Sequence, residues 1–238
     1  MSIRLDPSIN VAAARAQFAD SGQVQVMPWL AEADAVALEQ ELRGRDDWRE
    51  VINSGDKVFE LDRANQAKLG AADRAQLDAA VNAGGRSGFQ HRYESIRVTD
   101  EPEIRSRSVW LLDRFAIFMS SSPALDMLRD ITGIDDVDFV DAQATGYRPG
   151  DFLTAHHDEV PGKNRRAAYV LGLSRDWRTE WGGLLLFHDG RNDVEAGLLP
   201  RFNCLNLFAI PRIHSVSQVA SYAGGTRLSV TGWLRSIG

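Results

Sequence analysis

The carboxy-terminal part of the chain, from Val137 onward, is dominated by short runs in which apolar and polar side chains alternate. Alternation with a period of two is typical of β-strands with one buried face, because successive side chains of a strand point to opposite sides. Glycines and charged residues separate the runs, which predicts several short strands instead of a few long ones. The clearest strand candidates are Ala167 to Leu173, Gly183 to His188, Cys204 to Ile210, His214 to Val219 and Arg227 to Leu234.

The amino-terminal part has the periodicity of amphipathic helices, interrupted by a short strand pattern at Gln23 to Met27. Asn10 is a suitable cap for the first helix, and Ser21-Gly22 is a suitable end for it. We expect these helices to pack against the outer face of the larger sheet. The other helix candidates are Ala31 to Leu42, Ala71 to Asn82, Ser106 to Met119 and Pro123 to Thr132.

The length and composition suit one hydrophobic core. The chain has 238 residues, of which 44% are hydrophobic, and β-rich proteins of this size commonly form one domain. No internal repeat or low-complexity linker marks a boundary. We therefore expect a single domain, 1–238, with helices and a flap in 1–135 and the β-core in 136–238.

His156 and Asp158 point to a metal site. They flank His157 in a strand-like run, so His156 and Asp158 share one face of the strand and His157 lies on the other. If His214 approaches from a neighbouring strand, two imidazoles and one carboxylate converge. This set binds non-haem Fe(II) and leaves coordination positions open for catalysis. A His-x-Asp triplet alone arises readily by chance, so the assignment depends on further residues.

Arg227 is the residue that strengthens this interpretation. It begins a strand-like run in which Arg227, Ser229, Thr231 and Trp233 share one face. An arginine on the inner face of a core strand is costly unless it is paired. Its partner is either an internal carboxylate or a bound dicarboxylate, since both satisfy a guanidinium in the same bidentate way.

The order of these motifs resembles a known family. Together they are similar to the Fe(II)- and 2-oxoglutarate-dependent dioxygenases, and most of all to the prolyl 4-hydroxylase branch. The resemblance runs from about Val137 to the carboxy terminus. It implies a mainly β fold with packing helices, namely a double-stranded β-helix, which is a distorted, cupin-like jelly roll. The motifs are Tyr147-x-x-Gly150, His156-x-Asp158, Trp177, Gly182-Gly183, His214 and Arg227.

The resemblance also implies roles for individual residues. His156, Asp158 and His214 would bind Fe(II) and form the catalytic centre. Arg227 would bind the distal carboxylate of the cosubstrate 2-oxoglutarate, and Tyr147 would line the cosubstrate pocket. Dioxygen would be the second cosubstrate, with ascorbate as an optional reductant.

One position departs from the family pattern. In animal-type prolyl hydroxylases a tyrosine on the strand after the metal triplet helps the arginine bind the distal carboxylate, and the matching position here is Gly172. The missing hydroxyl is expected from Ser229, Thr154 or Tyr169.

The resemblance implies hydroxylation of a C–H bond, on a prolyl residue of a protein or peptide, with succinate and CO2 as coproducts. Alternatives remain open at the level of sequence. The same iron ligands would serve an oxygenase acting on another residue or on a small molecule. A cupin-type metal enzyme, or a binding module that does not use 2-oxoglutarate, is the other alternative.

Two segments near the expected site are candidates for substrate contact. Residues 86–107 mix aromatic side chains with arginines and are either a strand with a solvated charged face or a mobile flap. The run Glu159 to Arg166 has the composition of a solvent loop.

The overall charge argues against a general nucleic-acid binder. The formal net charge is −6, whereas such binders carry a basic surface. No segment approaches the roughly 20 apolar residues of a membrane span, and the start of the chain lacks a secretion signal. The single cysteine, Cys204, excludes an intramolecular disulfide. We expect a cytoplasmic protein with a protein or peptide substrate and no membrane or nucleic-acid partner. No sequence feature specifies an oligomeric state.

Overall fold

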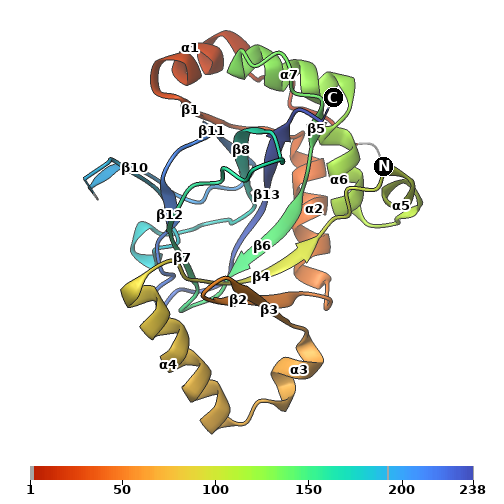
Figure 1. Cartoon of the computed structure of the whole chain (residues 1–238). Helices are drawn as coiled ribbons and strands as arrows, with labels where there is room; N and C mark the ends of the chain where they lie inside the picture. Colours follow the sequence, from red (N-terminus) through yellow and green to blue (C-terminus); the bar gives the residue numbers. More distant parts are fainter. Residues whose placement is uncertain (1–2, 192, 238) are drawn as a thin grey trace.

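A computed structural model describes residues 3–191 and 193–237 of the chain. Its centre is a strongly curled antiparallel β-sheet, with helices on one outer side and at one end (Figure 1). The helices are α1 (Val11–Ser21), α2 (Glu32–Gly44), α3 (Arg63–Lys68), α4 (Ala71–Ser87), α5 (Pro102–Arg107), α6 (Leu111–Met119) and α7 (Ser122–Thr132), with a short 3-10 turn at Thr179–Trp181. The strands are β1 (Gln23–Val26), β2 (Arg49–Ser54), β3 (Lys57–Leu61), β4 (His91–Arg97), β5 (Phe139–Val140), β6 (Gln143–Tyr147), β7 (Phe152–His156), β8 (Arg165–Gly172), β9 (Leu185–His188), β10 (Val194–Leu198), β11 (Cys204–Ala209), β12 (His214–Val216) and β13 (Arg227–Arg235).

The strand order is that of a jelly roll. Hydrogen-bonded neighbours follow the order β1-β11-β8-β13-β6-β4-β7-β12-β9-β10, while β2 and β3 extend the sheet from β4 and β5 pairs with β13. The sheet folds over between β4 and β7, so β7, β12, β9 and β10 form a smaller layer facing the larger one (Figure 1). This arrangement confirms the expected double-stranded β-helix.

Helices α1, α2, α6 and α7 cover the outer face of the larger layer, whereas α3 and α4 lie at the end of the molecule next to β2 and β3, so the expectation for Ala71 to Asn82 was wrong (Figure 1). The main hydrophobic core lies between the four covering helices and this layer, where Leu38 and Phe115 from the helices meet Tyr169 and Val230 from the strands. Asn10 caps α1 by accepting a hydrogen bond from the Ala13 amide at 3.0 Å, and Gly22 ends the helix in a left-handed conformation. Both features match the sequence-based expectation, as does the packing of the four covering helices.

Several expected elements differ in their limits. Ser106 to Met119 is not one helix, because the chain is extended at residues 108–110 between α5 and α6. Helix α4 continues through Gly84-Gly85 and ends at Ser87. The hairpin β2–β3 and the strand β10 carry no clear alternation in the sequence and were not expected.

The arginine-rich segment 86–107 contains a central strand. Its strand β4 pairs with β2, β6 and β7, so of the two alternatives the segment contains the strand and is not a mobile flap. The outward face is buried as well, because its charged side chains are paired. Arg92 lies 2.7 Å from Glu50, whose side chain is fully buried.

Within the described parts of the chain, none of the helices combines the length and apolar character needed to cross a lipid bilayer.

Candidate active site

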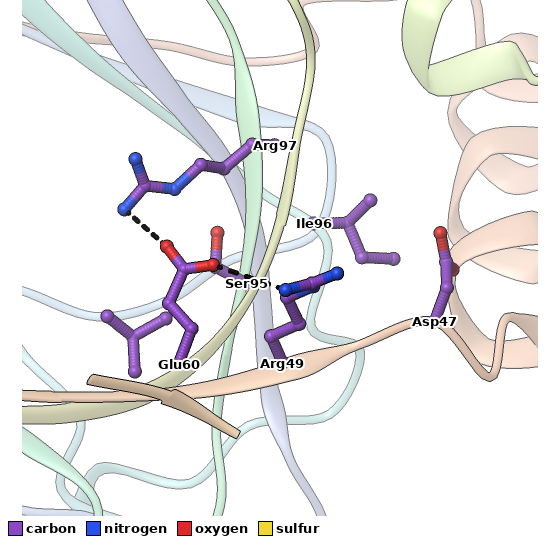
Figure 2. A pocket seen from close by; sticks show the side chains of 7 residues that line it. Asp47, Arg49, Glu60, Ser95, Ile96 and Arg97 are labelled. Carbon is purple, nitrogen blue, oxygen red and sulfur yellow. Dashed lines mark ion pairs between the residues drawn. The ribbon is translucent and has the colours of Figure 1, made fainter. Parts of the chain in front are cut away.

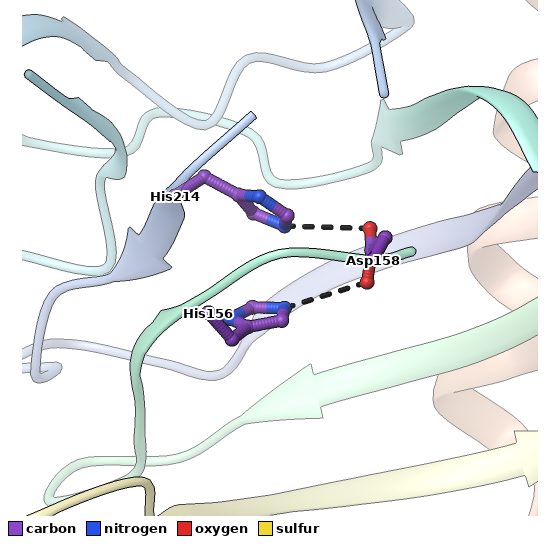
Figure 3. A group of neighbouring side chains, drawn as sticks. All are labelled: His156, Asp158 and His214. Atoms are coloured by element: carbon purple, nitrogen blue, oxygen red, sulfur yellow. Dashed lines mark ion pairs between the residues drawn. The ribbon is translucent and has the colours of Figure 1, made fainter. Parts of the chain in front are cut away.

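The register of the smaller sheet layer brings the two expected histidines together. His214 in β12 is the direct cross-strand partner of His156 in β7, and their ring centroids are 4.2 Å apart. Asp158 follows the end of β7 and turns back toward both rings (Figure 3). One ligand atom from each of the three side chains lies within 4.8 Å of the other two. His157 is exposed, as the alternation predicts.

The hydrogen bonds of the two imidazoles fix which nitrogen faces Asp158. Nδ1 of His156 lies 3.0 Å from the carbonyl oxygen of Thr154, and Nδ1 of His214 lies 2.9 Å from that of Arg212. A carbonyl only accepts, so each Nδ1 carries the hydrogen and each neutral ring directs its Nε2 lone pair toward Asp158. These Nε2 atoms are 3.5 Å from the Asp158 carboxylate oxygens. Converging lone pairs at this distance fit a bound cation better than direct hydrogen bonds.

The protonation states also suit a divalent cation. Burial raises the pKa of Asp158, but the neighbouring imidazoles of His156 and His214 lower it further than burial raises it. Burial and repulsion from His156 lower the pKa of His214 to about 4. An ionised carboxylate and a neutral imidazole are the forms that bind metals. The residues present therefore fit a metal ion.

Arg227 lies in the same pocket and has unused hydrogen-bonding capacity. It is the cross-strand partner of Tyr147 and is 3% exposed. Its Nε has no hydrogen-bond partner, and no carboxylate among the described residues forms an ion pair with it. Burial lowers its pKa, with only Tyr147 opposing. A buried guanidinium in this condition fits an anionic ligand.

The pocket that contains all four residues has a volume of about 460 Å³. This is large enough for a small dicarboxylate beside a further ligand. Its walls come from both sheet layers, with Gln143, Thr145 and Tyr147 of β6 on one side.

Of the three hydroxyls considered as replacements for the family tyrosine, Ser229 alone lies beside Arg227. Nη1 of Arg227 is 3.4 Å from Ser229 Oγ, which in turn lies 2.8 Å from Thr145 Oγ1. Thr154 does not line this pocket, because its hydroxyl accepts from the Gln90 amide and donates to the Gly88 carbonyl. Tyr169 packs in the core beneath the helices, where its hydroxyl donates to the carbonyl of Asp141.

The tyrosine position itself is closed. Gly172 is the cross-strand partner of Ser229, so a side chain there would be near Arg227. The main chain of Arg201 occupies that space, and its carbonyl oxygen would collide with any Cβ at residue 172. At position 172 the main chain of Arg201 therefore fills the space that a side chain would need, and no cavity is left there.

A second pocket of about 290 Å³ adjoins the site along β4. Glu60 lies between two arginines in it, 3.0 Å from Arg97 and 3.8 Å from Arg49 (Figure 2). The cross-strand register places Arg49, Ser95 and Thr145 opposite one another, so both pockets open on the same face of the sheet. Because its charges are paired, this second pocket gives no sign of a missing ligand.

Both segments considered as candidates for substrate contact contribute to the main pocket, although the sequence did not single out Phe89, His91 or Tyr93 within the first of them. Phe89, His91 and Tyr93 line the main pocket from β4 and the residues before it. Arg165 begins β8 instead of ending a solvent loop, and its guanidinium lies 3.5 Å from the centre of the Trp233 ring. The alternation of Phe89, His91 and Tyr93 was visible in the sequence but was obscured by the surrounding arginines.

Comparison with known proteins agrees with this geometry. Residues 142–235 match the family model of the 2OG-Fe(II) oxygenase superfamily. The fold is similar to a prolyl-4-hydroxylase from Pseudomonas putida, with a TM-score of 0.58, 21% identity and coverage of 94% of this chain and 98% of that one. It is also similar to a prolyl hydroxylase from Trichoplax adhaerens, solved with a hypoxia inducible factor peptide fragment (TM-score 0.56, 15% identity, coverage 95% and 89%).

A third similar structure is that of an enzyme described as an epimerase and not as a hydroxylase. The α-ketoglutarate-dependent epimerase SnoN from nogalamycin biosynthesis has a TM-score of 0.57, 12% identity and coverage of 96% and 83%. No functionally curated protein is significantly similar in sequence. We conclude that residues 142–235 form a domain of the 2OG-Fe(II) oxygenase superfamily, and that the fold of the whole chain resembles that of the prolyl hydroxylases named above.

Proposed function

We infer that the protein is an Fe(II)- and 2-oxoglutarate-dependent dioxygenase that hydroxylates a prolyl residue of a protein or peptide. Membership of the superfamily implies Fe(II), 2-oxoglutarate and O2 as cofactor and cosubstrates. The observation that carries the proposal is the shared pocket of a two-histidine, one-carboxylate cluster and a buried arginine without an anionic partner among the described residues.

His156, Asp158 and His214 would hold the iron. Their Nδ1 hydrogen bonds to main-chain carbonyls keep both Nε2 atoms aimed at the same point, and this reduces the reorganisation needed on binding. When bound, the iron supplies the oxidative chemistry that couples decarboxylation of 2-oxoglutarate to hydroxylation of the substrate. Asp158 supplies the single negative charge of the set.

Arg227 would bind the distal carboxylate of 2-oxoglutarate. Its free Nε and its Nη atoms offer a bidentate contact, and Ser229 with Thr145 supplies hydroxyls next to that contact. Tyr147 covers the guanidinium, with the Arg227 Cζ atom 5.0 Å from the ring centroid. Arg227 and Tyr147 are both buried, so this end of the pocket is the enclosed one.

Two features support a prolyl substrate. The walls near the metal cluster are rich in rings, including Phe89, Tyr93 and Trp233, which suit the apolar faces of a pyrrolidine. Similar structures include enzymes described as prolyl hydroxylases, one of them with a bound peptide fragment. A peptide also fits a pocket whose rim residues Val58 and Phe89 are about half exposed.

The experiment is turnover by the Fe(II)-loaded protein with 2-oxoglutarate and O2. Succinate formation reports cosubstrate use, and mass spectrometry of proline-containing peptides reports a gain of one oxygen. The expected result is succinate in every case and hydroxyproline in a subset of peptides. No succinate at any Fe(II) concentration would disprove the dioxygenase assignment. Succinate with oxidation confined to another residue or to a small molecule would disprove the prolyl assignment alone.

A further inference from the structure

A row of aromatic rings leads from the pocket rim to the cosubstrate end. The row starts at Phe89, two residues before β4, and continues through His91 and Tyr93 of β4 to Tyr147 of β6. Ring centroids are 5.6 Å apart between Phe89 and His91, 5.3 Å between His91 and Tyr93, and 5.5 Å between Tyr93 and Tyr147. Phe89 is half exposed at the rim, and its ring centroid is 5.7 Å from that of His156. His91 is the one member of this row with ring nitrogens.

The main chain on both sides of His91 is held firmly. The Asn53 side chain accepts a hydrogen bond from the His91 amide at 2.7 Å and donates one to the Phe89 carbonyl at 3.0 Å. Gln90 donates to both oxygens of Asn53. The imidazole is therefore fixed by its backbone and by the rings on either side, and it faces the pocket.

The Nε2 atom of His91 is left without a partner. The residue is 7% exposed, and this nitrogen is buried with no hydrogen-bond partner in the described structure. A buried polar atom in this state lowers the stability of the fold. His91 is not among the side chains that converge as metal ligands. Among the described residues, therefore, no contact of the His91 Nε2 atom compensates for the stability that is lost by burying it without a hydrogen bond.

The position of His91 indicates which ligand would use that nitrogen. The cosubstrate end of the pocket is defined by Arg227 and Tyr147, two rings farther along the row. On the other side, Phe89 joins His91 to the rim and to His156. A molecule that enters past Phe89 therefore reaches the metal cluster beside the imidazole of His91.

We propose that His91 is a substrate-positioning residue whose Nε2 forms a hydrogen bond with a main-chain polar atom of the bound peptide next to the target residue. This inference rests on the proposed function, since it assumes a peptide in the pocket. A neutral imidazole can donate to a peptide carbonyl or accept from a peptide amide, according to its tautomer. One such bond would fix the orientation of the residue to be oxidised.

The test compares His91→Phe, which keeps a ring between Phe89 and Tyr93, with His91→Gln, which keeps a hydrogen-bonding group at a similar reach. The probes are short synthetic peptides, each with one central proline in a different sequence context. On a peptide that the wild type hydroxylates, His91→Phe should raise the KM for peptide roughly 3- to 20-fold, as expected for the loss of one buried hydrogen bond. The KM for 2-oxoglutarate should stay close to the wild-type value, and His91→Gln should recover most of the loss.

His188→Phe is the matched control. This histidine lies outside the pocket, where its Nε2 is 2.7 Å from Ser215 Oγ. Its replacement should lower the Tm, whereas His91→Phe should not, because it removes an unsatisfied buried nitrogen.

Each outcome decides the inference. A lower Tm for His91→Phe with an unchanged KM for peptide would show a structural role only, and would overturn the proposal while leaving the proposed function intact. Equal KM values for peptide in the wild type, His91→Phe and His91→Gln would also overturn the proposal and leave the proposed function intact. If the wild type makes succinate but oxidises none of the peptides, the prolyl function fails and the inference fails with it.

Discussion

Arg227 and Tyr147 face each other across β13 and β6, and the guanidinium carbon of the arginine lies 5.0 Å from the centre of the tyrosine ring. The ring shields the charge without neutralising it. The site is thus arranged around a cation whose best partner is a ligand carboxylate.

Arg227→Ala should raise the KM for 2-oxoglutarate roughly 10- to 100-fold, because a charge-assisted hydrogen-bonded pair in an enclosed site is lost. Isothermal titration with the Mn(II)-loaded protein measures the same loss as a weaker Kd. Oxalate, which lacks the distal carboxylate, should bind the variant and the wild type alike. Arg175→Ala, whose guanidinium pairs with Glu39 at 2.7 Å elsewhere on the molecule, is the control. Equal losses for oxalate and 2-oxoglutarate would contradict the assigned role of Arg227.

His156→Ala and Asp158→Ala should each abolish metal binding. Removal of a direct ligand should weaken binding by more than the roughly 10- to 100-fold known for residues that only support a ligand. Titration with Co(II), followed by its visible absorption, measures the affinity without turnover. His157→Ala changes the exposed residue between the two and should bind Co(II) like the wild type. Retained Co(II) binding in Asp158→Ala would rule out the three-residue set.

Gly172→Ala should destabilise the protein because a Cβ there would meet the main chain of Arg201. Backbone cannot move aside as a flexible side chain can, so we expect a cost of about 1–3 kcal/mol and a lower Tm in a thermal melt. Gly190→Ala is the matched control, since a Cβ at Gly190 meets nothing within 4 Å. If Gly172→Ala were as stable as Gly190→Ala, the main chain of Arg201 would have to move aside at little cost in free energy, contrary to this prediction.

Asp151 predicts a pH dependence of stability. Burial raises its pKa to about 6, although Arg148 and Arg92 oppose the shift. Below pH about 4 the carboxyl is protonated in the folded and unfolded states alike, so its contribution is then fully present. As the pH rises toward 6 the unfolded chain ionises first, and this contribution to stability is lost.

Asp151→Asn removes that loss. Its stability relative to wild type should therefore increase between pH 4 and pH 7, by an amount on the order of 2 kcal/mol. Urea unfolding at several pH values measures the difference. A stability difference that is the same at all pH values would show that Asp151 titrates alike in both states.

The sequence predicted those features that depend on local periodicity. The alternation after Val137 predicted the strands of the core, and Asn10 with Gly22 predicted the limits of the first helix. The triplet around His157 predicted that His156 and Asp158 share the pocket, and the phase of the run after Arg227 predicted that Arg227, Thr231 and Trp233 line it, but Ser229 lies behind the pocket wall and contacts Arg227 there. These predictions held because one buried face is enough to fix the side-chain pattern of a strand.

The rest depended on contacts between distant residues. Strand β4 is charged on its outer face, which suggested solvent, yet Glu50 accepts ion pairs from Arg74, Arg92 and Arg148 and is fully buried. No periodicity reveals such a network, because its residues come from β2, α4, β4 and the turn after β6. In the same way, only the path of the main chain at Arg201 shows that no side chain fits at position 172. Only the hydrogen bond from the Gln90 amide shows that the Thr154 hydroxyl is already used and that Ser229 is the hydroxyl beside Arg227.

The direct pairing of His156 with His214 limits how this protein can change. A single residue inserted in β12 would rotate the imidazole of His214 to the outer surface, since neighbours along a strand alternate sides. The connections before and after β12 are not under that restriction. In homologous proteins, insertions and deletions should therefore occur mainly in the loops and be almost absent between the paired positions of His156 and His214 and the residues next to them in β7 and β12.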